Sequence, residues 1–354
     1  MPGTAARPHL FTVLPEELAQ LLRAGGIAIA DVESRRLLAH TLGPTGARDA
    51  ARRPLARRLT EAVAALTDGR RLELLERVTD PADGFVKYLF RLPDGALSEA
   101  VRIPLHRPGA FSICLSSQVG CGMECAFCAT GRLGAGRNLE AWEMVAAFVA
   151  VRDEAPGRVT GAVFQGQGEP LLNYDEVIRA ARVLSHPCGC KVSARAITIS
   201  TVGLPAQIRR YAREGHQYRL ILSLVSAIPE KRARLLPVAG RVPLPELAAA
   251  LHEYARAAAG RVTVGWVVMA GVNTGADEVA ALQALLGDLP LRLNLIDVND
   301  PRPDGFRQAD DAERKAFMDR LQVLKVPVVR RYSGGVGTHA ACGMLAARRI
   351  TETR

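Results

Sequence analysis

Short apolar runs alternate with amphipathic segments along most of this sequence. From about residue 110, six apolar runs predict strands over 111–115, 160–165, 194–200, 219–225, 262–269 and 291–297. Helical spacing of apolar residues predicts helices over 138–152, 174–185, 204–214, 243–258, 276–287 and 310–324. Strands joined by helical crossovers of this length pair in parallel. The pattern therefore predicts an α/β fold of six βα units, barrel-like or open, over roughly 220 residues.

The segment before residue 110 has a different pattern. Residues 1–80 are typical of small helices: Pro15, Glu16 and Glu17 favour a helix start, and Gly25-Gly26 favours its end. Residues 85–92 and 98–103 predict a β-hairpin around a Pro-Asp-Gly turn at 93–95. With 48% apolar and 23% charged residues among 354, the chain is typical of a folded protein with a large core, not of a disordered one.

The net charge of +10 favours a polyanionic partner, although an Arg-rich composition alone also explains it. Seven arginines crowd residues 45–71, and several are spaced to share one basic helix face or a solvated surface: Arg48, Arg52, Arg53, Arg57, Arg58, Arg70 and Arg71. The N-terminus lacks the apolar stretch of a secretory signal, and no run of about 18 apolar residues occurs. We therefore expect a cytoplasmic protein with no membrane partner.

Four of the seven cysteines lie close together, and three of them, Cys121, Cys125 and Cys128, follow the first predicted strand of the parallel sheet. Three thiolates from one loop can ligate three irons of a 4Fe–4S cluster and leave the fourth iron open. The alternative is zinc, which normally takes four ligands in two separated pairs. No second pair of suitable spacing follows, because Cys188 and Cys190 are separated by only one residue. The spacing therefore favours an iron–sulfur cluster.

The spacing C-x-x-x-C-x-x-C after the first strand resembles the radical-SAM superfamily, in which the open iron binds S-adenosylmethionine (SAM) and reduction yields a 5′-deoxyadenosyl radical. Further motifs, in order, resemble the RlmN/Cfr family of RNA methyltransferases, which methylate adenine carbons. These motifs occupy residues 114–121, 166–173, 199–203, 294–299 and 340–343. The resemblance implies a partial (β/α)6 radical-SAM barrel over 110–332. It also implies an N-terminal helical RNA-gripping domain over 1–80, a β-hairpin extension over 81–109 and a C-terminal segment over 333–354.

The resemblance also implies catalytic roles for Cys342, Cys114 and Glu99. Cys342 accepts a methyl group from one SAM, and a second SAM, cleaved at the cluster, activates that methyl group by hydrogen abstraction. The methylene radical adds to C2 or C8 of an adenine, which gives a protein–RNA thioether. Glu99 stands where the family has its proposed base. Cys114 then attacks Cys342, releases the product and leaves a disulfide that must be reduced.

SAM contacts are implied for residues at the carboxyl ends of predicted strands: Gly168, Glu169, Ser200, Ser223, Leu224, Val225 and Asn299. A glycine permits close backbone approach, and a carboxylate pairs with the SAM ammonium. The expected partners are an RNA substrate (rRNA or tRNA), an electron donor such as flavodoxin or ferredoxin, and a disulfide reductant. Two alternatives stay open: the same chemistry on a non-RNA acceptor, because residues 1–80 differ from the family pattern, and a non-catalytic, zinc-bearing nucleic-acid-binding protein.

Overall fold

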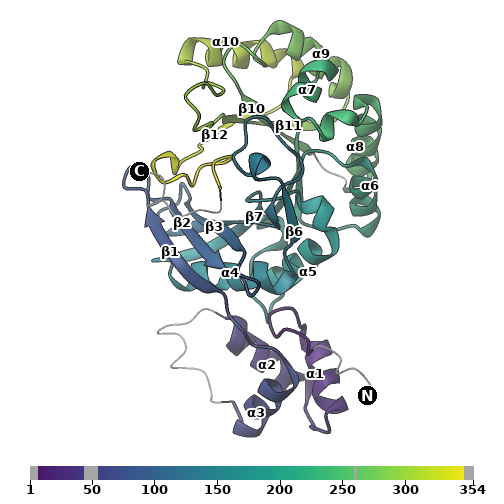
Figure 1. Ribbon diagram of the computed structural model, residues 1–354. Coiled ribbons are helices and arrows are strands. Elements are labelled where there is room, and N and C mark those ends of the chain that lie inside the picture. Colours follow the sequence, from purple (N-terminus) through teal and green to yellow (C-terminus); the bar gives the residue numbers. More distant parts are fainter. Residues whose placement is uncertain (1–6, 44–54, 259–260, 347–354) are drawn as a thin grey trace.

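One sheet organises the computed structural model, which describes residues 7–43, 55–258 and 261–346 (Figure 1). Its ten described strands lie in the order β1-β2-β3-β4-β7-β8-β9-β10-β11-β12. The first three are β1 (Glu73–Thr79), β2 (Val86–Arg91) and β3 (Leu97–Pro104), which are antiparallel. The others, all parallel to one another, are β4 (Ala110–Leu115), β7 (Arg158–Phe164), β8 (Ile197–Thr201), β9 (Arg219–Ser223), β10 (Val262–Val268), β11 (Leu291–Asp297) and β12 (Val328–Arg331). The α/β fold with a parallel sheet is confirmed.

Helices follow the parallel strands as crossovers. They are α4 (Ala141–Asp153), α5 (Tyr174–Ser185), α6 (Pro205–Glu214), α7 (Pro229–Leu235), α8 (Leu244–Ala258), α9 (Ala276–Leu286) and α10 (Asp311–Leu321). Side chains alternate along each strand, so each strand has two different faces. On β8, for example, Ile197 and Ile199 belong to the main apolar core, whereas Thr198 and Ser200 line a cavity on the other face. The sheet therefore has one face packed in the main core and another face that lines the cavity.

The six predicted strands of the parallel sheet and the six predicted helices are all present, with ends shifted by a few residues. The sequence missed the last strand, β12, which is short and contains two arginines, Arg330 and Arg331. It also missed the short helix α7. No described helix is both long and apolar enough to cross a membrane.

Three helices precede the sheet: α1 (Pro15–Ala24), α2 (Asp31–Leu42) and α3 (Arg57–Leu66). α1 begins and ends where predicted. The expectation that residues 1–80 form only helices is wrong for Glu73–Thr79, which pair with β2 as the edge strand β1. This half-exposed segment has no clear alternation, and its strand conformation depends on tertiary pairing.

The arginines of residues 45–71 are distributed over several elements. Arg57 and Arg58 begin α3, whereas Arg70 and Arg71 lie beyond its end. Arg48, Arg52 and Arg53 fall outside the described residues. The described arginines therefore do not share one helix face.

The N-terminal helices pack directly on the parallel domain. Arg152 of α4 donates hydrogen bonds to the carbonyl oxygens of Leu42 and Gly43 at the end of α2. His9 stacks on Trp142 of α4, with ring centroids 4.2 Å apart. Because a guanidinium at a helix C-terminus satisfies carbonyls that lack helical partners, these contacts orient α2 against α4.

Candidate active site

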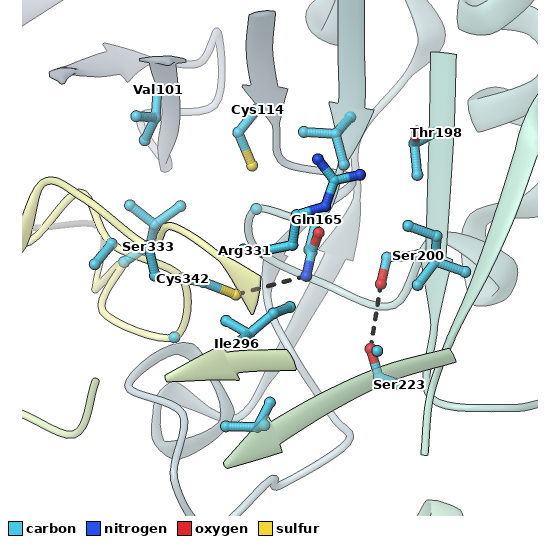
Figure 2. A pocket seen from close by; sticks show the side chains of 18 of the residues that line it. Val101, Cys114, Gln165, Thr198, Ser200, Ser223, Ile296, Arg331, Ser333 and Cys342 are labelled. Atoms are coloured by element: carbon cyan, nitrogen blue, oxygen red, sulfur yellow. Dashed lines mark hydrogen bonds between the residues drawn. The ribbon is translucent and has the colours of Figure 1, made fainter. Parts of the chain in front are cut away.

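A cavity of about 490 Å³ lies on the inner face of the parallel strands. It is lined by side chains from β4, β7, β8, β9, β10 and β11 and from the C-terminal segment, as Figure 2 shows in close-up. Five of the seven cysteines line it: Cys114, Cys121, Cys125, Cys128 and Cys342. Positions more than 200 residues apart in the sequence thus share one chamber, as the sequence analysis predicted for a common site.

The loop that carries Cys121, Cys125 and Cys128 is closed at its base by two short strands, β5 (Gln118–Gly120) and β6 (Ala135–Asn138). Gly120 has a φ of +70°, and a Cβ there would lie 2.4 Å from the Gly134 carbonyl oxygen. Only a glycine therefore lets the two ends of the loop cross so closely. Farther along the loop, the Ala126 amide donates to the Leu235 carbonyl oxygen at 3.0 Å, which fixes the loop against α7.

Burial shifts the ionisation of two of the loop thiols, Cys121 and Cys125. It raises the pKa of Cys121 to about 11 and raises the pKa of Cys125 as well, and the neighbouring thiols of the loop act in the same direction. Such thiols release their protons when a metal supplies positive charge. In the described part of the chain, no three His, Cys, Asp or Glu side chains converge as they would around a single metal ion. Three thiols from one loop facing a chamber fit a polynuclear cluster by donor type and number.

Cys342 reaches the chamber because its segment is tied down at several points. The Ala129 amide, next to the cysteine loop, donates to the Gly343 carbonyl oxygen at 2.7 Å, and the Thr130 hydroxyl donates to the Leu345 carbonyl oxygen at 2.6 Å. Farther back, Asp83 Oδ2 accepts from the Gly335 amide at 2.7 Å. These bonds place Cys342 between the cysteine loop and the antiparallel strands.

Cys114 and Cys342 both face the chamber (Figure 2) and both are free thiols. Cys342 is exposed to the cavity itself, while the surrounding protein desolvates it and raises its pKa to about 12. Burial also raises the pKa of Cys114 to about 12, and the charge of Cys342 opposes its ionisation further. The Gln165 side-chain amide donates a hydrogen bond to Cys342 Sγ at 3.6 Å. Cys342 therefore lies close enough to Cys114 to oppose the ionisation of the Cys114 thiol.

Gly168 and Glu169 follow β7 and line the same chamber. Gly168 has a φ of +96°, and a Cβ there would lie 2.6 Å from the Cβ of Gln118. The Glu169 carboxylate accepts from the amides of Leu171 and Val202, each at 2.9 Å, while burial raises its pKa to about 7. A buried carboxylate with this pKa is stabilised in its ionised form by an incoming cation such as an ammonium group.

Two hydroxyl groups belong to the polar part of the chamber wall. Ser200 on β8 and Ser223 at the end of β9 lie with their Oγ atoms 3.3 Å apart (Figure 2). Both are strand-end residues of neighbouring parallel strands, as the sequence analysis predicted. Together with Glu169, they give one side of the cavity donors and acceptors suited to a polar amino acid moiety.

Four of the predicted site residues do not line the chamber: Glu99, Leu224, Val225 and Asn299. Leu224 and Val225 are fully buried, and the Val225 carbonyl oxygen accepts from the Asn273 side chain at 2.8 Å. Val225 also has a φ of +66°, an unusual conformation for a β-branched residue. The Asn299 amide donates to Ser333 Oγ at 2.8 Å and so ties the end of β11 to the C-terminal segment.

Glu99 is buried on β3, where its Oε1 lies 3.0 Å from the Lys87 ammonium. Alternation along β3 places Glu99 on the same face as Val101, which does line the chamber. Glu99 therefore lies beside the chamber wall, held in an ion pair.

Sequence reasoning missed Gln165, Asp83 and Arg331 as residues of this site. Gln165 directly precedes a recognised motif and follows a predicted strand, so its position was available as a signal. Asp83 and Arg331 had no such signal, because one acts through a long-range contact and the other lies on the strand that the sequence missed.

Comparisons with known proteins agree with this geometry. Residues 115–282 match the Radical SAM superfamily. A protein of Anaeromyxobacter sp. (strain Fw109-5), named a probable RNA methyltransferase, is 47% identical over 344 residues, covering 96% of this chain and 99% of the relative. A probable dual-specificity RNA methyltransferase RlmN of Synechococcus elongatus is 38% identical over 80% of this chain and 79% of its own length. The crystal structure of a radical SAM methyltransferase from Sphaerobacter thermophilus superposes with a TM-score of 0.86 at 34% identity, covering 96% of this chain and 100% of that one.

Proposed function

This chain belongs to the RlmN-related family of radical SAM methyltransferases, and on that premise we propose that it methylates a ring carbon of adenine, C2 or C8, in RNA. The observation that carries the proposal is the presence of Cys114 and Cys342 in one chamber with the three loop cysteines. A methyltransferase that only moved a methyl group from SAM to a nucleophile would need neither thiol. The names of its relatives, probable RNA methyltransferases, support RNA as the substrate class.

The superfamily implies a 4Fe–4S cluster and SAM, and the residues present fit both. Cys121, Cys125 and Cys128 would hold the cluster, and Gly168, Glu169, Ser200 and Ser223 would hold SAM. Leu224, Val225 and Asn299 do not line the chamber, so we propose that they support the SAM-binding strand ends from behind its wall. When bound, these groups supply a 5′-deoxyadenosyl radical that abstracts hydrogen. We propose two SAM molecules per turnover, one as methyl donor and one as radical source.

Cys342 is the proposed methyl carrier. Its thiolate attacks the methyl carbon of SAM, so that an S–CH3 bond forms and S-adenosylhomocysteine leaves. The methylated side chain then loses a hydrogen atom to the 5′-deoxyadenosyl radical, and its carbon bonds to the adenine ring carbon. The adduct gives up one electron, which the iron–sulfur cluster would take back, so that only a proton remains to be removed from the ring carbon.

Glu99 and Cys114 then resolve the covalent adduct. Glu99, which pairs with Lys87, accepts the proton from the substituted ring carbon. The Cys114 thiolate attacks Cys342 Sγ, an S–S bond forms as the S–CH2 bond breaks, and the product carbon takes up a proton. The resulting Cys114–Cys342 disulfide needs two electrons from a reductant before the next turnover.

We propose that the N-terminal helices bind the RNA substrate, which is rRNA or tRNA. Other basic residues of this +10 chain contribute to the binding. An electron donor such as flavodoxin or ferredoxin would reduce the cluster. Residues 1–80 are thus the proposed accessory domain, 81–109 the extension, 110–332 the catalytic barrel and 333–354 the methyl-accepting segment.

The experiment uses the cluster-loaded protein, methyl-labelled SAM and total RNA from a strain that lacks the gene. Mass spectrometry of the nucleosides should reveal a C-methylated adenosine. The Cys342→Ala variant should cleave SAM but transfer no methyl group, because the carrier is missing. Cys188→Ala is the matched control, since Cys188 is half-buried and away from the chamber, and it should behave like the wild type. RNA methylation by Cys342→Ala would contradict the proposed mechanism, and labelling of a small molecule instead of RNA would contradict the proposed substrate.

A further inference from the structure

One carboxamide side chain meets the proposed methyl-carrying sulfur inside the chamber. Gln165 directly follows β7 and is half-buried, and its Nε2 donates to Cys342 Sγ at 3.6 Å, across 177 residues of sequence (Figure 2). Among the residues that the structure describes, no hydrogen bond engages its Oε1. The carboxamide therefore has one acceptor atom facing the chamber that the protein itself does not use.

We propose that Gln165 is a specificity-determining residue that reads the target base as adenine. In the adduct, only a methylene group separates Cys342 Sγ from the adenine ring carbon. The adduct therefore brings the ring nitrogen next to that carbon close to the Gln165 carboxamide, which hydrogen-bonds the same sulfur. The inference rests on the proposed function, because it assumes that the base is joined to Cys342.

The hydrogen-bonding pattern of adenine suits a carboxamide whichever carbon reacts. C2 is flanked by N1 and C8 by N7, and each of these acceptor nitrogens lies beside the N6 amino group on its edge of the base. A carboxamide can donate to the ring nitrogen and accept from N6, which is the bidentate pairing that Gln and Asn make with adenine in nucleic-acid complexes. Guanine has an oxygen at position 6, so the same carboxamide would set its Oε1 against another acceptor.

Methylation of Cys342 also frees the carboxamide for this task. A thiolate is a good acceptor for the Gln165 amide, whereas a methyl thioether is a weak one. The donor that first favours the Cys342 thiolate is thus available to the base when the methyl group is in place. One side chain serves the two halves of the reaction in turn.

The test compares two synthetic RNAs with the same enzyme. Both carry the sequence around the adenosine identified by mass spectrometry, and in one of them that nucleotide is replaced by purine riboside, which lacks the N6 amino group. We expect wild-type kcat/KM to fall by about 10- to 100-fold for the purine RNA. The Gln165→Met variant should lose activity on adenine RNA and discriminate by less than about threefold. Discrimination is the ratio of kcat/KM for the adenine RNA to kcat/KM for the purine RNA, measured with one enzyme. A change in the rate of Cys342 methylation affects both values equally and therefore cancels.

Thr198→Val is the matched control, since Thr198 lines the same chamber from β8 without bonding Cys342, and its ratio should equal that of the wild type. Equal kcat/KM on both RNAs with the wild-type enzyme would overturn the inference, and so would full discrimination by Gln165→Met. The mass of Cys342 is measured in parallel. A wild-type enzyme that never methylates Cys342 contradicts the proposed function, whereas a methylated Cys342 with no base discrimination contradicts this inference alone.

Discussion

At the scale of single residues, burial shifts the ionisation of several reactive groups. The pKa of Cys114 and that of Cys342 are both raised to about 12, and that of Glu169 is raised to about 7. A desolvated acid is ionised only when a cation or a hydrogen-bond donor compensates for the lost water. We therefore expect Cys114, Cys342 and Glu169 to ionise more readily when a bound ligand supplies a cation or a hydrogen-bond donor.

The raised pKa of Glu169 predicts how SAM binding depends on pH. The SAM ammonium prefers the ionised carboxylate, so affinity should rise as pH increases from 5.5 through about 7. Below pH 7 we expect roughly a tenfold loss of affinity per pH unit, measured by equilibrium dialysis with the cluster-loaded enzyme. Glu169→Gln should bind weakly with little pH dependence, whereas Ser200→Ala should weaken binding and keep the profile. A flat profile for the wild type would show that Glu169 does not pair with the ammonium.

Gly168 provides a second prediction at this scale. Gly168→Ala should lower the free energy of unfolding by about 1–2 kcal/mol because of the left-handed backbone, and by about 1–3 kcal/mol more because the new Cβ collides with Gln118. The variant should also lose SAM binding. Gly95→Ala is the control, because its φ is +86° but a Cβ there meets nothing within 4 Å. Urea denaturation measures both variants. Equal destabilisation would mean that the close approach to Gln118 is unimportant.

At the scale of elements, the C-terminal segment is positioned by the turn between β1 and β2. Asp83 Oδ2 accepts from the Gly335 amide and the Tyr332 hydroxyl, and Asp80 Oδ2 accepts from the Gly337 amide at 2.9 Å. Two carboxylates outside the parallel sheet thus hold the backbone that carries Cys342. Hydrogen bonds to charged groups are among the stronger ones in proteins.

Loss of one of these carboxylates should loosen the segment without unfolding the barrel. For Asp83→Ala we expect about 2 kcal/mol less local stability, seen as about 30-fold faster hydrogen exchange at the Gly335 amide, and slower methylation of Cys342. Asp94→Ala removes a carboxylate from the neighbouring turn, where Asp94 pairs with Arg137, and should leave exchange at Gly335 unchanged. Unchanged exchange in Asp83→Ala would show that other contacts suffice.

At the scale of the whole molecule, charge and domain packing act together. The +10 chain places its N-terminal helices on α4 through Arg152, so an RNA held by those helices would be held in a fixed relation to the chamber. Electrostatic attraction to phosphates is screened by salt. A protein of this charge gains RNA affinity mainly by releasing counterions.

RNA affinity should therefore fall by about 10- to 1000-fold between 50 and 200 mM salt, measured by fluorescence anisotropy. Arg58→Glu, at an exposed position of α3, should lower affinity by about tenfold and make the salt dependence less steep. Arg256→Glu changes the charge equally at an exposed position of α8 and should have a small effect. If both reversals weaken binding alike, the N-terminal helices are not the gripping surface.

Local patterns made much of this protein predictable. Alternation and helical spacing identified the strands and helices of the parallel sheet, because those periodicities reflect which face of each element is buried. The spacing of Cys121, Cys125 and Cys128 placed three thiols on one loop, because near neighbours in sequence must share a loop, and all three line the same chamber. The segment 73–79 and the strand β12 were missed because their local patterns are weak and their strand pairing is a tertiary effect.

The sequence by itself determined the order of βα units, the cysteine loop and the strand-end positions of Gly168, Glu169, Ser200 and Ser223. The tertiary structure alone decided that Cys342 and Gln165 meet, that Glu99 pairs with Lys87, and that Asp80 and Asp83 hold the C-terminal segment. The contacts of Cys342, Asp80 and Asp83 join elements that lie far apart in the chain. The Glu99–Lys87 pair joins neighbouring strands, but it depends on how far each side chain reaches. Periodicity and spacing do not contain that information, because they describe only what happens within a few residues.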